Sequence, residues 1–175
     1  IVNGHFKPDS GQHLKKVTHL RQGVSKELSD ARFSPDITRK YVVADMITGY
    51  GVSEAVLHYY KIWKNQDVRG KRVIVQGWGN VGSAAAFYMA QAGAKVVGII
   101  DRSGGLLNTD GFTFDEIRSL FTNKEGNTLV SDNMLSFEEI NEKVWSIGAE
   151  IFLPCAASRL ITQAQSDLMI SNGLE

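Results

Sequence analysis

Three runs along the chain are short and almost continuously apolar: residues 73–75, 95–101 and 150–153. Runs of this length without polar alternation are typical of strands buried in a parallel sheet. The segments around them carry helical patterns, so the predicted order is helices, strand, helix, strand, hairpin, helix, helix, strand, helix. Strands that alternate with helices predict a Rossmann-like, doubly wound α/β fold whose mainly parallel sheet has helices on both faces.

The first third of the chain is predicted to be loop and helix. Residues 1–13 are polar and have the composition of a leading loop or linker. An amphipathic helix should follow, either as a docking helix for another domain or, as we favour, as a local packing helix. Residues 37–47 should form a second helix with Asp36 near its N-cap. The amphipathic helix before it is predicted from the helical spacing of four apolar residues, Leu14, Val17, Val24 and Leu28.

A clearer helix is predicted from Thr48, with one face formed by Val52, Ala55, Val56, Tyr59 and Trp63. Gly70 should lie in the turn before the first strand, and residues 103–111 should form a small hairpin or loop excursion.

Further helices should begin at residues 114 and 137, because Thr113 and Ser136 each stand three residues before a glutamate, the spacing of a capping box. Residues 122–133 are polar and should form a surface connection. A last helix should be capped by Thr162 or Ser166 and closed by Gly173.

The most informative motif is a GxGxxG pattern after the first predicted strand. Gly77 permits a tight turn, Gly79 lets a pyrophosphate approach the backbone, and Gly82 lets the following helix pack against the strand. The N-terminus of that helix offers free N–H groups to anionic phosphates. Trp78 is expected to be a packing residue that shields this edge. Together with the flanking elements, the motif predicts a dinucleotide site.

An acidic residue, Asp101, ends the second predicted strand about 20 residues past the last glycine, where a carboxylate can accept hydrogen bonds from the adenosine ribose. The same carboxylate should repel a 2′-phosphate, which favours NAD over NADP. Arg102 complicates this preference, since a guanidinium pairs well with phosphate, although it can also lie solvated over the adenine. NAD is therefore the expected cofactor and NADP remains possible.

Composition narrows the function classes. The 175 residues include 19 Lys and Arg against 19 Asp and Glu, so there is no electrostatic footprint for nucleic acid or a membrane surface. The four histidines are scattered and no metal site is expected. The single cysteine, Cys155, suits a reducing, cytoplasmic protein without an internal disulfide. Because the chain opens on Ile1 and stops at Glu175 without a terminating signal, we interpret it as a piece of a longer protein.

Several segments resemble the sequences of the glutamate, leucine, phenylalanine and valine dehydrogenases. Their motifs are most similar to those of the glutamate dehydrogenases. These segments are residues 48–52, 75–82, 93–97, 101–111 and 153–157 with Ile161 and Thr162. The resemblance extends over residues 46–175 and fails over 1–45. It implies a leading segment followed by an incomplete NAD(P)-binding domain, the C-terminal domain of a larger dehydrogenase. That parent would be a homo-oligomer that converts an amino acid to a 2-oxo acid and ammonia, whereas the fragment, which lacks the catalytic lysines, should be inactive and hold no catalytic residue.

The resemblance also assigns roles to single residues. It places the backbone of Gly79, Asn80 and Val81 against the pyrophosphate. Thr48 would hydrogen-bond the nicotinamide carboxamide, with a plain helix N-cap as the alternative. The nicotinamide would be walled by Pro154, Cys155 and Ala156, and Cys155 is interpreted as a packing residue rather than a nucleophile.

Three features depart from the family pattern: Tyr50 stands where a small or basic residue is usual, Ser158 and Arg159 replace a Glu-Asn pair, and the segment 1–45 is longer than the short connection expected there.

Two other functions share the glycine motif. A non-catalytic nucleotide sensor that binds only the adenosine half would not need the wall at 153–157 or Thr48, so these residues favour the enzyme. A methyltransferase site has no diphosphate and so does not require the third glycine.

Overall fold

The computed structural model describes residues 11–175. The chain divides into two compact units, Ile1–Met46 and Ile47–Glu175. The second unit contains the sheet and every element of the predicted dinucleotide motif.

In the first unit, helix α1 spans Gly11–Val24, so the predicted leading loop is wrong for residues 11–13, and residues 1–10 lie outside the described part. A helix is present as predicted up to Val24. Leu28 lies beyond it, where its N–H donates to the carbonyl oxygen of Tyr41 at 2.9 Å.

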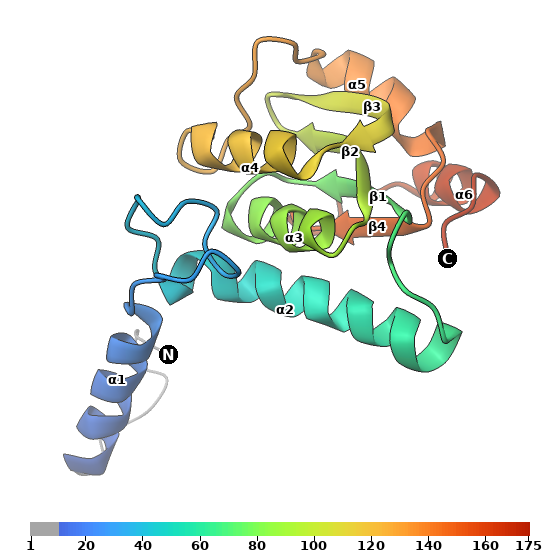
Figure 1. Ribbon diagram of the computed structural model, residues 1–175. Coiled ribbons are helices and arrows are strands. Elements are labelled where there is room, and N and C mark those ends of the chain that lie inside the picture. The colour runs from blue at the N-terminus through green and yellow to red at the C-terminus, as the bar shows by residue number, and fades with distance from the viewer. Residues whose placement is uncertain (1–10) are drawn as a thin grey trace. The chain divides into compact units, whose positions relative to one another are not determined.

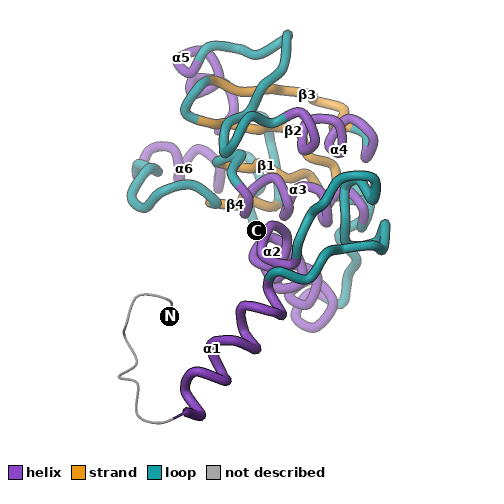
Figure 2. The backbone as a smooth tube through the Cα atoms, turned by 90° about the vertical axis from the view of Figure 1, so that its left-hand side faces the viewer, coloured by secondary structure: helices purple, strands orange, loops and turns teal. Residues whose placement is uncertain are grey.

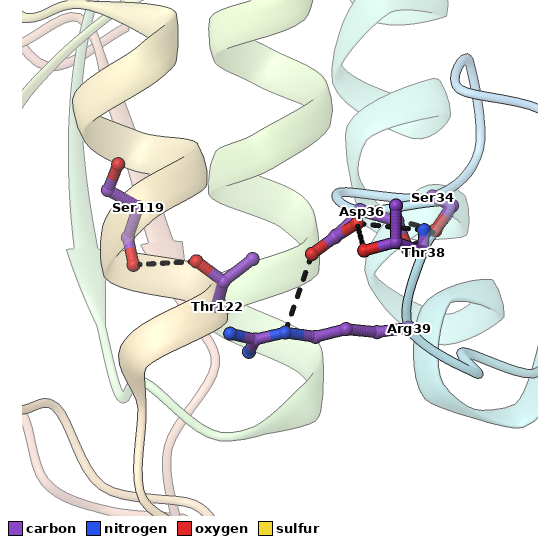
Figure 3. Close-up of polar contacts among 6 residues, drawn as sticks. All are labelled: Ser34, Asp36, Thr38, Arg39, Ser119 and Thr122. Carbon is purple, nitrogen blue, oxygen red and sulfur yellow. Dashed lines mark hydrogen bonds and ion pairs between the residues drawn. The ribbon is translucent and has the colours of Figure 1, made fainter.

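The helix predicted over 37–47 is wrong in its first half, because helix α2 begins at residue 43 and spans Val43–Tyr59. Asp36 is not a helix cap. Its Oδ1 accepts from the N–H of Thr38 at 2.8 Å and from the Thr38 hydroxyl at 2.6 Å, as Figure 3 shows. Arg39 pairs with the same carboxylate at 3.4 Å. Such local bonds to an aspartate stabilise a turn at the expense of a helix.

Helix α2 continues into a π-helical turn, η1, at Tyr60–Lys64. Val52 and Val56 pack against the core as predicted, but Tyr59 is 41% exposed and Trp63 is 79% exposed. Tyr60, 2% exposed, is buried in their place. A regular 3.6-residue period does not anticipate a π turn, in which hydrogen bonds join residues five apart. The π turn accounts for the exposed position of Trp63, which lies within it, whereas Tyr59 is the last residue of α2.

The second unit is built on a four-stranded mixed sheet in the order β3-β2-β1-β4. The strands are β1 at Arg72–Gln76, β2 at Lys95–Asp101, β3 at Gly104–Phe112 and β4 at Ile151–Pro154. Strand β1 pairs in parallel with both β2 and β4, and β3 is antiparallel to β2. The predicted Rossmann-like α/β fold is confirmed.

The hairpin or loop excursion predicted within residues 103–111 is wrong, because nearly all of these residues form the single strand β3, which pairs antiparallel with β2 through a turn at Arg102 and Ser103. The Asp-Gly pair at 110–111 does not form its turn, since both residues lie within β3. Gly111 has φ +86° there, and a Cβ at this position would stand 2.7 Å from the Cβ of Lys95. The glycine therefore serves close strand packing rather than a reversal.

Helices cover both faces of the sheet (Figures 1 and 2). Helix α3 spans Asn80–Gln91 and α4 spans Phe114–Asn123, on the face shared with the latter part of α2. The opposite face carries α5 at Phe137–Lys143, the 3₁₀ turn η2 at Val144–Ser146, and α6 at Gln163–Ser171. Capping boxes begin α4, α5 and α6, which confirms the predicted starts at 114 and 137 and assigns the last cap to Thr162.

Successive residues of a strand point to opposite faces, and the two cores follow this alternation. Val73 and Val75 enter the core under α3, while Ile74 between them enters the core under α5 and η2. Within the described residues, no helix is long and apolar enough to span a membrane.

Candidate functional site

The carboxyl ends of the three parallel strands meet at one edge of the sheet. Gln76 at the end of β1 pairs with Ile100 of β2 on one side and with Pro154 of β4 on the other. A cavity of about 700 Å³ opens at this edge, a size that suits a small-molecule or cofactor ligand. Open α/β sheets bind ligands at this place. The lining includes Gln76, Gly77, Trp78, Gly79, Asn80, Val81, Ile100, Asp101, Arg102, Asn127, Phe137, Asn141, Cys155, Ala156, Ala157 and Leu160.

The first and third glycines of the motif are required by packing. Gly77 has φ +89°, and a Cβ there would stand 2.9 Å from the Cβ of Ala156. At Gly82 a Cβ would stand 1.9 Å from the carbonyl oxygen of Gly77, so no side chain fits. The residues 77–82, named here the glycine turn, therefore bring the start of α3 against the end of β1. The packing role predicted for Gly82 is present in this geometry, and Gly82 itself does not line the cavity.

The second glycine stands on the open side of the glycine turn. The three atoms nearest to a Cβ on Gly79 all belong to the side chain of Asn127, at 3.6 Å and beyond. Helix α3 begins at the next residue, Asn80, and Asn80 and Val81 line the cavity. The first N–H groups of a helix have no carbonyl partner within it and carry partial positive charge. The arrangement can hold an anionic group such as a diphosphate.

Asp101 ends β2 beside the glycine turn and is only 9% exposed. Its Oδ2 accepts from the N–H of Leu129 at 3.0 Å, and its Oδ1 lies 3.5 Å from the N–H of Trp78. Trp78 is fully buried, and its indole N–H donates to the carbonyl oxygen of Leu120 in α4. The packing role predicted for Trp78 agrees with this burial.

Residues 124–129, named here the 124–129 segment, reach the cavity beside the glycine turn, and Asn127 lines it. Lys124 donates to Oδ1 of Asn80 at 2.8 Å, and Arg102 donates to Oγ1 of Thr128 at 2.9 Å. Leu129 is 1% exposed within the apolar core. The prediction of a plain surface connection over 122–133 is therefore wrong for this stretch.

The opposite wall of the cavity follows β4. The N–H of Cys155 donates to the carbonyl oxygen of Gln76 at 2.9 Å, which continues the β1–β4 ladder by one residue. Burial raises the pKa of the Cys155 thiol to about 11, so the sulfur is a neutral thiol at physiological pH. A neutral, half-buried thiol fits the packing role predicted for Cys155.

Pro154 does not line this cavity. It lines an adjoining hollow of about 430 Å³ together with Ser158 and Arg159. Four residues line both spaces: Gln76, Ala156, Ala157 and Leu160. The two residues that depart from the family pattern thus face the second space.

Thr48 lies inside α2 rather than at its start, so its alternative role as an N-cap is wrong. Thr48 does not line the cavity. The next residue, Gly49, packs on α3, where a Cβ would stand 2.6 Å from the carbonyl oxygen of Val81. Thr48 is thus adjacent in sequence to a contact with the first turn of α3. Tyr50 packs edge-on against the ring of Tyr88, with centroids 5.1 Å apart.

Sequence reasoning missed several lining residues. Asn127 lies in the segment predicted as surface, and Phe137 and Asn141 come from α5, more than 50 residues after the glycine turn. The only available signal was Phe137, an apolar residue directly after the helix cap Ser136. No group of three or more metal-ligating side chains occurs within the described residues.

The comparisons with known proteins agree with this geometry. The family model described as Glutamate/Leucine/Phenylalanine/Valine dehydrogenase matches residues 42–175. The chain belongs to this family. The predicted resemblance is confirmed at that level.

Curated relatives within the family carry both cofactor specificities in their names. The catabolic NAD-specific glutamate dehydrogenase of Bacillus subtilis (strain 168) is 37% identical over 99 residues, which are 57% of this chain and 22% of the relative. The NADP-specific glutamate dehydrogenase of Psychrobacter sp. (strain TAD1) is 30% identical over 131 residues, 73% of this chain and 29% of the relative. The chain thus spans less than a third of the length of these relatives.

Solved structures of glutamate dehydrogenases share the fold. The hetero-hexameric enzyme from Thermus thermophilus in its leucine-bound form superposes with a TM-score of 0.56 at 26% identity, covering 71% of this chain and 28% of that chain. Glutamate dehydrogenase 2 of Plasmodium falciparum gives a TM-score of 0.58 at 27% identity, covering 75% and 30%.

Proposed function

We propose that residues 46–175 are the cofactor-binding domain of an NAD(P)-dependent amino-acid dehydrogenase that acts on glutamate. The observation that carries this proposal is the single cavity that joins the glycine turn, Asp101 and the wall at Cys155 and Ala156. A glycine turn alone serves many nucleotide proteins, whereas a wall opposite it accommodates the second half of a dinucleotide.

The residues fit the proposed cofactor. The open space at Gly79 and the start of α3 suit a diphosphate, and Asp101 retains acceptor capacity for the adenosine ribose. Pro154, with Ser158 and Arg159, would line the nicotinamide end in the adjoining hollow, and Thr48 would approach the carboxamide from α2.

When bound, the cofactor exchanges a hydride with the substrate, and this chain binds and orients it. The small side chains of Ala156 and Ala157 leave room beside the β4 edge, and the neutral Cys155 thiol adds no charge there. The amino acid and 2-oxo acid would be held by the rest of the full-length protein, which we expect to be oligomeric, as the hetero-hexameric structural neighbour is.

Calorimetric titration of the 175-residue chain with NADH tests the proposal. Half of a cleft loses the contacts of the other half, so we expect saturable binding of one NADH with a Kd of about 10 μM or weaker. We expect no turnover of glutamate by this chain alone. The absence of both binding heat and a thermal shift at millimolar NADH would contradict the proposal.

A further inference from the structure

The buried carboxylate of Asp101 joins two parts of the chain that are far apart in sequence. One oxygen faces the N–H of Trp78 in the glycine turn, and the other accepts from the N–H of Leu129 in the 124–129 segment. A buried carboxylate is expensive to desolvate unless hydrogen bonds compensate it. These two backbone donors therefore explain why Asp101 can be buried, and they tie the segment to the end of β2.

The 124–129 segment is held at both of its ends. Lys124 is bonded to Asn80 at the start of α3, and its ammonium also lies 4.9 Å from the ring centroid of Phe121. At the other end, Leu129 is buried, and the Ser103 hydroxyl lies 3.5 Å from its carbonyl oxygen. A segment with both ends fixed has little freedom in between.

Asn127 lies between these fixed ends and lines the cavity. Oδ1 of its side-chain amide is 3.6 Å from the place that a Cβ on Gly79 would occupy. It therefore faces the open side of the glycine turn, where the N-terminus of α3 favours an anion. A half-turn of this amide about its Cβ–Cγ bond exchanges Oδ1 for the NH₂ group, whose two N–H donors suit a phosphate oxygen.

We propose that Asp101 is a positioning residue that holds the 124–129 segment over the glycine turn, and that Asn127 of this segment binds the diphosphate of the dinucleotide. The inference rests on the proposed function for its ligand. The 124–129 segment then forms a third wall of the cavity, besides the glycine turn and the residues that follow β4. Asp101 has a structural role in holding this wall, which is independent of its contact with the ribose.

Hydrogen exchange of the 175-residue chain without cofactor tests the positioning role. Asp101→Asn keeps the size of the side chain but sets an NH₂ group against one of the two backbone donors. Because the asparagine oxygen can accept from only one of the two donors, we expect exchange at the Leu129 or the Trp78 amide to rise about tenfold, the worth of one hydrogen bond to a charged group. Unchanged exchange at both amides in a folded Asp101→Asn protein would overturn the positioning role.

NADH titration tests the third wall. Asn127→Ala changes an exposed residue, so the fold should survive, and NADH affinity should fall about tenfold. The matched control is Asn123→Ala, which changes an exposed asparagine at the end of α4 outside the cavity lining. This variant should bind NADH as tightly as the unsubstituted 175-residue chain. Parent-like affinity of Asn127→Ala would overturn the diphosphate contact.

The double variant separates a positioning role from a direct ribose contact. If Asp101 acts partly through Asn127, the double variant loses less NADH affinity than the product of the two single losses, because both single variants lose the Asn127 contact, whereas independent contacts would multiply. A double-variant loss equal to that product would overturn the coupling. Failure of the parent chain to bind NADH would overturn the proposed function and the third wall together, while the exchange of Leu129 would still decide the positioning role.

Discussion

The glycine turn and the 124–129 segment face the same cavity, yet they are held in place by different means. In the glycine turn, backbone meets backbone, and a Cβ at Gly82 would stand 1.9 Å from the carbonyl oxygen of Gly77, five residues away. In the segment, side chains bridge long separations: Lys124 to Asn80, Arg102 to Thr128, and Asp101 to Leu129.

This difference predicts how each wall responds to change. Backbone packing tolerates no added atom, so substitutions in the glycine turn should damage either the fold or the ligand site outright. Hydrogen-bonded side chains can be removed one at a time, so substitutions around the segment should have graded effects.

The largest effect should follow Gly82→Ala. The added Cβ collides with backbone rather than with a movable side chain, so unfolding in urea should show a loss of about 3 kcal/mol. Gly51→Ala in α2 is the matched control, because a Cβ there meets nothing within 4 Å. It should stabilise the chain by about 0.5–1 kcal/mol. Equal stability changes in the two variants would refute the packing argument.

Gly79→Val should separate binding from folding. The open space at Gly79 accepts a Cβ, but a branched side chain fills the place proposed for the diphosphate. We expect NADH affinity to fall by about a hundredfold, while the free energy of unfolding changes by about 1 kcal/mol or less. Calorimetry and urea denaturation measure the two quantities. Affinity like that of the parent would place the phosphates elsewhere.

Cofactor choice tests the charge of Asp101 against that of its neighbour. A carboxylate at the ribose disfavours a 2′-phosphate, so the unsubstituted 175-residue chain should bind NADH about tenfold more tightly than NADPH. Asp101→Ser loosens the 124–129 segment and lowers both affinities, so the ratio between them is the informative quantity, and it should approach one. Tighter binding of NADPH by the parent would show that the preference is reversed.

The smallest effect should come from Arg102→Ala. Arg102 is exposed and bonded to Thr128, so its attraction for a 2′-phosphate is screened by solvent. We expect NADPH affinity to fall about threefold and NADH affinity to fall by about twofold or less, because the bonds of Asp101 and Lys124 still hold the 124–129 segment. Arg118→Ala, which removes an equally exposed guanidinium paired with Asp115 in α4, should change neither. A large loss of NADH affinity in Arg102→Ala would indicate that the arginine supports the segment.

The same contrast explains what the sequence could predict. Gly77, Gly79 and Gly82 stand at fixed spacing within one strand-turn-helix, so local geometry reveals their roles, and the capping boxes at Thr113 and Ser136 do so for two helix starts. Asn127 joins the cavity only because Leu129 reaches Asp101 across the fold, and no local pattern encodes such a bond. The helix predicted over 37–42 and the buried position predicted for Trp63 were wrong because the Asp36 turn and the π turn interrupt the helical period there, and no periodic pattern encodes either turn.

The central claim is that a dinucleotide lies between the glycine turn and the 124–129 segment. An NMR titration of the isotope-labelled chain with NADH tests it directly, because backbone amide shifts report which residues meet the ligand. The account predicts saturable shifts at Gly79, Asn80 and Val81 and at the backbone and side-chain amides of Asn127. Shifts confined to the hollow beside Pro154 and Arg159, with the glycine turn unmoved, would contradict it.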